Sequence, residues 1–387
     1  KDKFVNLLKL KTSYGEQGND NIGSFRYADY YRIESVNDEV SYIFDTKGNK
    51  DITWETVGSF NIGAEFELLK GRVKGDLEFY NRKTSDMLMW FSVPYNLGYS
   101  GYYDNIGDMT NRGLEFDLTA QIIKTKNIDW SLNANITWQH NRLSYLPEEK
   151  KGYTAKTADG ETYHGYQSSY IFYGEGLPMR SWYLKDYAGV NEQGLSTWYY
   201  TDTDGTRKPT TDFDKANYYL CGSAMPDVYG GFGTTLNAYG FDFTANFIYS
   251  LGGKMIDYGY MQLMTPPATS STGYNYHKDI FNAWSETNTS SNIPRWQYGD
   301  ESTSYISSRF LTSGSYLSLR GLTLGYTLPK SLTSKWHISK LRLYVAADNV
   351  LYWTARDGFD PRNSTTYSYA SSYHPIRTIS GGLQVDL

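Results

Sequence analysis

The chain has 387 residues, and its 38 Tyr, 17 Phe and 10 Trp exclude intrinsic disorder, because disordered chains are poor in aromatic residues. No run of about 18 apolar residues occurs, which excludes a transmembrane helix. A formal net charge of -5 disfavours a nucleic-acid-binding domain, and the single cysteine, Cys221, excludes an internal disulfide. A Tyr-rich and Gly-rich all-β protein remains, which is a sandwich, a propeller or a membrane β-barrel.

Apolar and polar residues alternate along the predicted strands, the first of which spans residues 4–14. In residues 113–122, Leu114 and Phe116 fall on one face and Glu115 and Asp117 on the other, because successive side chains of a strand point to opposite faces. The same alternation, which indicates half-buried strands, recurs in residues 61–68, 73–79, 132–139, 241–247 and 379–387. Three of these segments have two acidic residues each on the polar face, and we expect these six to line a lumen: Glu65, Glu67, Asp76, Glu78, Glu115 and Asp117.

Short and long connections alternate between these strands. The short polar turns include Lys70-Gly71, Thr125-Lys126-Asn127 and Tyr239-Gly240. The long connections span residues 15–55, 85–105, 144–168, 191–227, 254–311 and 354–373. Outer-membrane barrels have short periplasmic turns and long extracellular loops, whereas soluble sandwiches keep most loops short. We therefore predict a transmembrane antiparallel β-barrel with about twelve strands in this chain, each close to the length of about 9–11 residues that a tilted membrane strand needs.

Two of the predicted strands, residues 170–176 and 181–190, alternate poorly. The last strand, residues 376–387, is expected to end on the periplasmic side. Aromatic residues near strand ends favour the membrane interpretation, because such residues form girdles at both interfaces; they are Trp130, Trp138, Tyr326, Trp336, Tyr344 and Trp353. The alternative is a soluble sandwich whose Trp residues form the core.

Short motifs occur in a defined order along the whole chain. They are LKTSYGEQGN at 10–19, TWE at 53–55 with NIG at 61–63, FYNRKTSDML at 79–88, NIG at 105–107 with NRGLE at 111–115, GSAMP at 222–226 with GGF at 230–232, GSYLSL at 314–319 with LGYTLP at 324–329, and DN at 348–349 with GFDP at 358–361. In this order they resemble the C-terminal part of the barrel of SusC-like (SusC/RagA) TonB-dependent outer-membrane transporters. The chain departs from the family at Ser318, where Arg or Lys is usual, and at Leu387, where such barrels usually end in Phe or Trp.

The resemblance implies a complete barrel of about 22 strands with a plug domain inside it. We expect the plug and the N-terminal strands to lie outside residues 1–387. The start, Lys1-Asp2-Lys3-Phe4, is neither a Met start nor a signal peptide, so we expect a mature fragment or a truncated protein.

The implied function is TonB-dependent import of an oligosaccharide or oligopeptide across the bacterial outer membrane. A SusD-like lipoprotein would cover the barrel, and TonB would act through the plug. The resemblance implies no enzymatic activity, no cofactor and no nucleic-acid partner.

Aromatic side chains in the long loops, with arginines beside them, are the candidate cargo contacts. Flat rings stack on sugar faces and offer a large contact area. The candidates are Tyr102, Tyr103, Arg295, Trp296, Tyr298, Arg362, Tyr367, Tyr369 and Tyr373. The alternatives are that these residues pack the loops together or contact the lipoprotein.

One loop, Thr201-Asp202-Thr203-Asp204-Gly205, partly resembles a calcium loop. It lacks the bidentate Glu, and Pro209 intervenes, so a solvated acidic turn is the simpler interpretation of Asp202 and Asp204. The alternating acids of the strands form no catalytic pair, and no nucleophile with a base is identified. Two other classes remain open: a secreted or surface β-rich glycan-binding module or adhesin, and a barrel enzyme.

Overall fold

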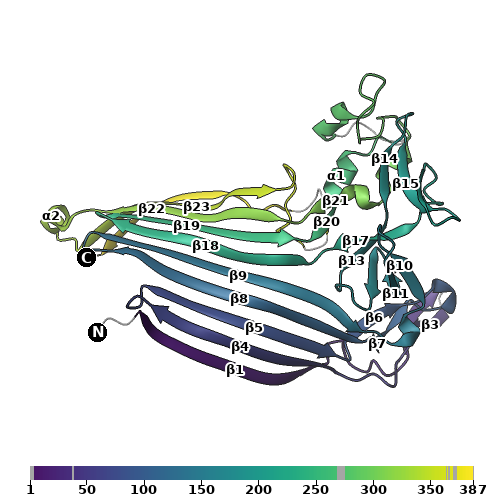
Figure 1. Ribbon diagram of the computed structural model, residues 1–387, viewed down its shortest axis with the longest axis horizontal. Coiled ribbons are helices and arrows are strands. Elements are labelled where there is room, and N and C mark those ends of the chain that lie inside the picture. Colours follow the sequence, from purple (N-terminus) through teal and green to yellow (C-terminus); the bar gives the residue numbers. More distant parts are fainter. Residues whose placement is uncertain are drawn as a thin grey trace.

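Ten long strands form one antiparallel sheet in the computed structural model (Figure 1), which describes residues 4–36, 39–267, 275–362, 364, 367–368 and 373–386. Consecutive long strands are neighbours throughout the sheet. In order they are β1 (Val5–Asn19), β4 (Glu55–Leu68), β5 (Val73–Ser85), β8 (Asp108–Lys124), β9 (Ile128–Tyr145), β18 (Pro226–Ala238), β19 (Phe241–Gly252), β22 (Tyr316–Thr327), β23 (Lys340–Thr354) and β25 (Thr378–Asp386).

The long sheet has ten strands rather than the expected twelve or so. The two segments with poor alternation, residues 170–176 and 181–190, form β12 (Ile171–Gly174), β13 (Ser181–Lys185) and β14 (Tyr187–Val190) in small separate sheets. Side chains of β12 and β13 are buried on both faces. A strand that is covered on both faces does not need alternation, which is why the sequence pattern was weak there.

One end of the sheet carries tight turns, which we call the short-turn end. Tyr239 and Gly240 both have positive φ, 52° and 89°, as a two-residue turn between twisted strands requires. Leu69, Lys70 and Gly71 also have positive φ. The connection from β22 to β23 is longer and contains α2 (Lys330–Thr333) and η6 (Ser334–Trp336).

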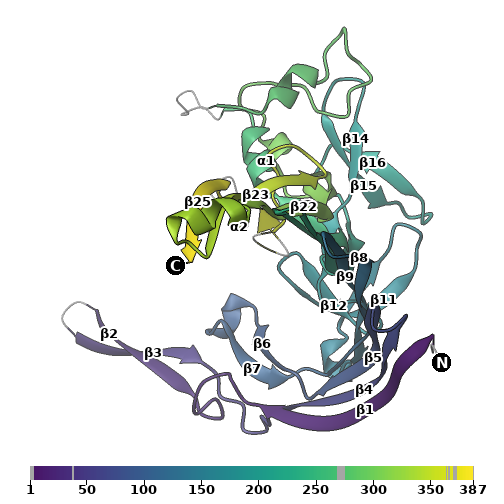
Figure 2. The ribbon, with the colours of Figure 1, turned by 90° about the vertical axis from the view of Figure 1, so that its left-hand side faces the viewer.

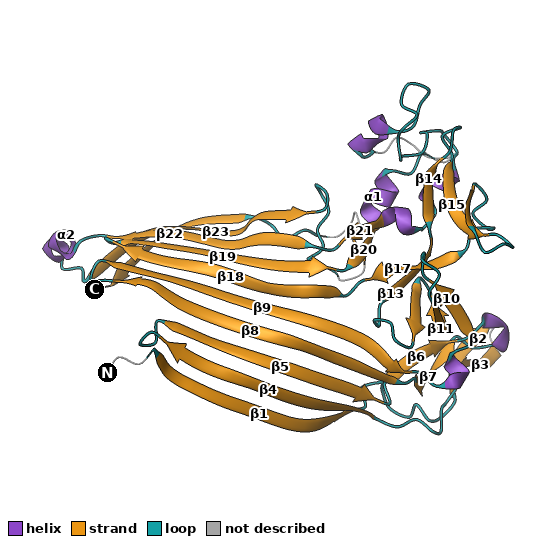
Figure 3. Cartoon of the chain, in the orientation of Figure 1, coloured by secondary structure: helices purple, strands orange, loops and turns teal. Residues whose placement is uncertain are grey.

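The opposite end carries connections of residues 20–54, 86–107, 146–225, 253–315 and 355–377, and we call it the long-loop end. The sequence predicted two separate loops at residues 144–168 and 191–227, but both belong to the single connection 146–225 between β9 and β18. Figure 3 shows that these loops fold into small sheets and short helices of their own. Their strands are β2 (Tyr30–Val36), β3 (Glu39–Thr46), β6 (Leu88–Ser92), β7 (Gly101–Asn105), β10 (Tyr153–Lys156), β11 (Thr162–Ser168), β15 (Ser196–Thr201), β16 (Arg207–Thr210), β17 (Tyr218–Ser223), β20 (Lys254–Asp257), β21 (Leu311–Ser313) and β24 (Tyr367–Ser368). Their helices are η1 (Tyr95–Leu97), η2 (Glu148–Lys150), α1 (Tyr258–Leu263), η3 (Lys278–Asn282), η4 (Glu301–Ser304) and η5 (Ser308–Phe310).

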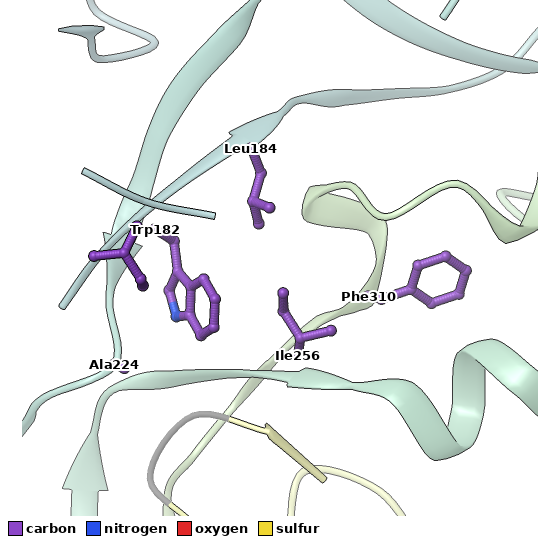
Figure 4. Close-up of a cluster of buried hydrophobic side chains, with 6 residues drawn as sticks. Trp182, Leu184, Ala224, Ile256 and Phe310 are labelled. Atoms are coloured by element: carbon purple, nitrogen blue, oxygen red, sulfur yellow. The ribbon is translucent and has the colours of Figure 1, made fainter. Parts of the chain in front are cut away.

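The hydrophobic cores lie in these loops. Trp182 and Leu184 of β13 pack with Ile256 of β20 and Phe310 of η5, and these four side chains are 0–1% exposed (Figure 4). A second cluster joins the loops to the end of β9; it consists of Met87, Ile106, Leu143, Leu146 and Tyr166. The described parts of the 86–107, 146–225 and 253–315 connections therefore pack together, and we call them the loop cap.

The long strands, in contrast, expose one apolar face. Leu10 is 78% exposed, Ile62 50% and Leu114 44%. Trp336 at the short-turn end and Trp353 at the long-loop end are also more than half exposed. An apolar sheet face of this extent needs a non-aqueous environment or a partner.

The sheet is open (Figure 2). β1 forms one edge and β25 the other, and these two strands do not pair with each other in the described part of the chain. None of the helices among the described residues is long and apolar enough to cross a membrane.

Candidate functional site

The six acidic residues predicted for the lumen lie on one face of the sheet. In the register of β4, β5 and β8, Glu65 is opposite Asp76, and Asp76 is opposite Asp117. Glu78 and Glu115 are opposite each other one step along the same face. The other face of these strands carries the exposed apolar side chains.

Lysines neutralise only part of this acidic patch. Lys11 Nζ lies 2.7 Å from Asp76 and 3.3 Å from Glu78, and Lys74 Nζ lies 2.5 Å from Glu67. Glu115 and Asp117 form no ion pair within the described residues. Like charges directly opposite each other on neighbouring strands are unfavourable, so this face is suited to water and to cationic groups from outside the sheet.

In the middle of β9 and β18 the same face carries amides and glycines instead of acids. Asn135 of β9 accepts a hydrogen bond from the backbone of Gly231, at 2.8 Å between nitrogen and oxygen. Gly231 and Gly233 of β18 lie opposite Asn135 and Asn133. An acidic sector thus adjoins an amide sector on one continuous polar surface.

Tyr102 and Tyr103, two candidate cargo contacts, pack within the loops. Both are in β7 and half-buried. Lys150 Nζ donates to the Tyr102 hydroxyl at 3.3 Å, and the Tyr103 ring lies 5.3 Å from that of Trp90, centroid to centroid. Their described contacts are those of loop packing.

Lys150 was not singled out from the sequence. It is 5% exposed, and its Nζ lies 2.7 Å from Asp104 and 3.8 Å from the centroid of the Phe91 ring. Burial alone would lower the pKa of Lys150, but Asp104 outweighs it and raises the pKa. Lys150 lies in a Glu-Glu-Lys-Lys run, and nothing in such a charged run indicates that one of its lysines is buried.

Arg362 is also held in the structure rather than free for cargo. Its guanidinium pairs with the buried Asp360, at 2.8 and 2.7 Å, and donates to Ser318 Oγ at 3.0 Å. Ser318 is one of the two positions at which the sequence departs from the family pattern. A guanidinium from the loop therefore reaches the place where the strand itself lacks a basic side chain.

Arg295 and Tyr298 come together at a pocket, whereas the neighbouring Trp296 packs edge-to-face on Tyr276, 5.0 Å between centroids. The pocket has a volume of about 430 Å³ and is also lined by Ser196 and Asp300. The Tyr298 side chain is 58% exposed. These residues are contributed by two loops that are about 100 residues apart in sequence.

Among the aromatic candidates whose side chains the structure describes, Tyr373 does not line that pocket. Tyr373 is 84% exposed. The Tyr367 side chain and the whole of Tyr369 lie outside the part that the structure describes. Arg295 and Tyr298 were candidates from the sequence, and they stay candidates. Ser196 and Asp300, which line the same pocket, were not among them, because isolated Ser and Asp residues in a polar loop have no distinguishing pattern.

The acidic turn at Asp202 and Asp204 is neutralised by a lysine. Lys208 Nζ lies 2.6 Å from Asp202 and 3.7 Å from Asp204. Hydrogen bonding to Lys208 holds the pKa of the Asp202 carboxyl below its ordinary value. Across the described ranges, no group of three or more His, Cys, Asp or Glu side chains is placed to hold a metal ion.

Comparison with known proteins identifies the family. The sequence model of one protein family, described as "TonB dependent receptor-like, beta-barrel", matches residues 3–253. The chain belongs to this family. TonB-dependent receptor P3 of Formosa agariphila is 28% identical, over 98% of this chain and 39% of that protein. TonB-dependent receptor SusC of Bacteroides thetaiotaomicron is 27% identical, over 93% of this chain and 36% of that protein.

A solved structure agrees with the sequence comparisons. The RagAB peptide transporter matches the whole chain with a TM-score of 0.83 and 26% identity, over 41% of its own chain. The chain thus spans about two fifths of the length of the relatives it matches. The prediction of a SusC-like C-terminal barrel sector in the bacterial outer membrane is confirmed.

Proposed function

We propose that this chain forms part of the wall and of the extracellular cap of a TonB-dependent importer for an oligosaccharide or oligopeptide. The whole-chain match to the RagAB peptide transporter carries the proposal. The similarity to SusC supports the same function class. The family consists of transporters, and we infer that this member has no enzymatic activity.

In this proposal the exposed apolar face contacts lipid and the polar face lines a water-filled lumen. Glu65, Glu67, Asp76, Glu78, Glu115 and Asp117 then lie on the lumen wall. Interiors of large outer-membrane barrels are polar, while their outward faces are apolar. The surplus of negative charge near Glu115 and Asp117 suits contact with cationic groups of a plug domain.

The proposed transporter also needs strands beyond those described. Open sheet edges are not tolerated in lipid, because each unpaired backbone group there costs several kcal/mol. The edges β1 and β25 would therefore pair with strands outside residues 1–387. A plug inside the completed barrel would connect the cargo to TonB.

A SusD-like lipoprotein is the proposed partner above the loops. The hairpin of β2 and β3 extends away from the long strands (Figure 2) and exposes Tyr31, Ile33, Val40 and Tyr42 by 56–71%. The register places all four on one face of the hairpin. An uncovered apolar face of this kind is typical of a protein contact.

Uptake by whole cells tests the proposed function. A strain that lacks the full-length gene is compared with a complemented strain in a mixture of neutral oligosaccharides and short peptides. We expect the complemented strain alone to deplete one of these cargo classes, and a TonB deletion to abolish the depletion. Equal depletion by all strains, or depletion that continues without TonB, would contradict the proposal.

A further inference from the structure

The apolar face of β8 ends in a basic residue at the long-loop end. The apolar side chains of this face are Leu114, Phe116, Leu118, Ala120 and Ile122. From Leu114 to Ile122 the strand rises by about 27 Å, which a tilt of about 40° reduces to about 20 Å across a membrane. This nearly fills the apolar band of an outer-membrane barrel, which is about 25 Å tall. Arg112, the next residue on the same face, therefore lies at the level of the lipid headgroups.

Neighbouring strands add two further cations to this face. Arg112 is opposite Asn81 of β5 and His140 of β9, and these three residues form one row. The next row toward the loops consists of Lys83, Thr110 and Arg142. We call Lys83, Arg112 and Arg142 the basic patch, and all three are exposed.

The three cations of the basic patch surround Thr110. Lys83 and Arg142 are opposite Thr110 on its two sides, and Arg112 is two residues from it on the same strand. Diagonal neighbours across an antiparallel pair of strands are about 7–8 Å apart, so Arg112 is near both of the other cations. The long side chains of all three residues can therefore meet at one anionic group.

Acidic residues neutralise only part of this charge. Lys83 Nζ lies 2.7 Å from Asp108. Glu16 of β1 is on the same face, but it is two strands away from Lys83 and accepts a hydrogen bond from the Tyr14 hydroxyl at 2.6 Å. The charges of the two arginines are thus left over.

The two arginines have no carboxylate partner in the part of the chain that the structure describes. The Arg112 side chain forms neither an ion pair nor a hydrogen bond there, and Arg142 Nε donates to the carbonyl of Gly176 at 3.3 Å. A guanidinium group presents paired N–H donors that match the oxygens of a phosphate group. A phosphate would therefore supply the counter-ion that these strands lack.

The basic patch is confined to β5, β8 and β9, which are neighbours in the wall (Figure 1). At the same end of the sheet, the apolar face of β19, β22 and β23 carries Tyr249, Leu317 and Trp353 in one row. Trp353 is 51% exposed. A charged boundary common to all strands would recur at that row. The local concentration of cations indicates a specific contact instead.

The row on the other side of Arg112 is apolar, which favours a lipid as the source of the phosphate. It consists of Phe79, Leu114 and Trp138. Leu114 is 44% exposed and Trp138 43%. Acyl chains can lie against these side chains while the headgroup reaches the basic patch. A soluble phosphate would gain nothing from this row.

We propose that the basic patch binds the phosphate group of a glycolipid in the outer leaflet of the outer membrane. Arg112 and Arg142 donate to the phosphate oxygens, and Lys83 adds a further positive charge. The Asn81 amide and the Thr110 hydroxyl lie beside them and can form hydrogen bonds with sugar hydroxyls. The proposal rests on the orientation of the wall in the function proposed above, because it needs the apolar face in lipid and the long loops outside the cell.

Native mass spectrometry of the full-length protein, purified in detergent, tests the site. The probes are lipid A that carries a phosphate group, the same lipid A after removal of the phosphate, phosphatidylglycerol, and inorganic phosphate as a competitor. We expect phosphorylated lipid A to bind about tenfold more tightly than either other lipid, because it alone combines the phosphate with the sugar. Inorganic phosphate should not displace it at constant ionic strength, since it lacks acyl chains.

The variants remove charge from exposed side chains. Arg112→Gln should weaken the binding of phosphorylated lipid A about fivefold, and Arg112→Gln with Arg142→Gln tenfold or more, because each arginine near an anionic lipid surface adds to the attraction. Arg82→Gln is the matched control, since Arg82 is also exposed but is opposite Asn111 on the other face of the sheet. It should leave the affinity unchanged. An elution volume and melting temperature equal to those of the wild type identify folded variants.

Four results would overturn the proposal. Phosphorylated lipid A binds no better than the other two lipids, inorganic phosphate displaces it, Arg112→Gln binds it as the wild type does, or the arginine variants lose the lipoprotein rather than the lipid. The last result would show that a protein covers the patch.

TonB-dependent uptake measured in parallel separates this proposal from the import function. Intact uptake together with any of these four results contradicts the lipid site alone. Lipid binding that depends on Arg112, without TonB-dependent uptake, contradicts the import function alone. Weaker lipid binding by Arg82→Gln in place of Arg112→Gln would reverse the two faces of the wall and contradict both.

Discussion

Phe116 and Asp117 are adjacent in sequence but lie on opposite faces of β8. Phe116 pairs with Leu77 and Ile136, which are 45% and 41% exposed, whereas Asp117 pairs with Asp76 and Asn135. We predict that Phe116→Arg lowers the free energy of unfolding by about 2–4 kcal/mol, because it places a charge in lipid, while Asp117→Arg has little effect. Refolding of the full-length protein into lipid vesicles across a denaturant series measures both changes. If the two substitutions lower the free energy of unfolding equally, the assignment of Phe116 to the lipid-facing side and of Asp117 to the lumen side is wrong.

Asp360 provides a pH-dependent contact in the loop that follows β23. Its side chain is 0% exposed; burial raises its pKa, but Arg362 outweighs burial, so the pKa lies below the ordinary value. His374 Nδ1 is 3.5 Å from the same carboxylate. A carboxyl whose pKa is depressed in the folded state contributes stability above its unfolded pKa, about 3.9, and loses it as the pH falls through the folded value.

We therefore predict that protection of residues 355–362 from hydrogen exchange is constant from about pH 7 to 5 and falls only below about pH 4. Asp360→Asn should destabilise this loop at pH 7 by about 3 kcal/mol, because it leaves Arg362 buried without its partner, and should remove that part of the acid sensitivity. Asp357→Asn, an exposed acid in the same loop, is the matched control. Loss of protection between pH 7 and 5 would show that another group controls the loop.

At the scale of elements, the hairpin of β2 and β3 has one apolar and one polar face. Ile33 is paired with Tyr42 on the apolar face, while Arg32 and Glu34 form an ion pair with 2.9 Å between nitrogen and oxygen. We predict that Ile33→Ser with Tyr42→Ser reduces the amount of lipoprotein that co-purifies by tenfold or more, because buried apolar area is lost from the contact.

The control for this experiment is Arg32→Ser with Glu34→Ser on the same hairpin. It should leave the co-purified amount unchanged within a factor of about two, since exposed ion pairs contribute about 1 kcal/mol or less. If both double variants retain the lipoprotein, the apolar face of the hairpin is not its docking surface.

The elements differ in how well the sequence predicted them. Strands such as β8 and β9 face lipid on one side and a polar space on the other. Apolar and polar residues therefore alternate strictly along them, and this pattern predicted the strands from the sequence. The strands of the loop cap, such as β13, are buried on both faces and lack that signal. The same alternation predicted that the acidic residues share one face of the sheet. Ser196 and Asp300 line the same pocket only because parts of the 146–225 and 253–315 loops pack together, and no local sequence pattern indicates that packing.

At the scale of the whole molecule, hydrophobic residues are divided between two environments. Trp182 and Phe310 are buried inside the loop cap, while Leu10 and Leu114 are exposed on the long sheet. A soluble protein would bury the second group, so the division is explained by a membrane around the strands and a packed cap in water.

We propose that these ten strands are a sector of a larger transport barrel. Cryo-electron microscopy of the full-length protein, extracted from the outer membrane in detergent, tests this arrangement. We expect that β1 and β25 are each hydrogen-bonded to strands from outside residues 1–387, that a plug fills the lumen beside Glu115 and Asp117, and that a lipoprotein covers the loops. A map in which β1 pairs with β25 to close a ten-stranded barrel would contradict it.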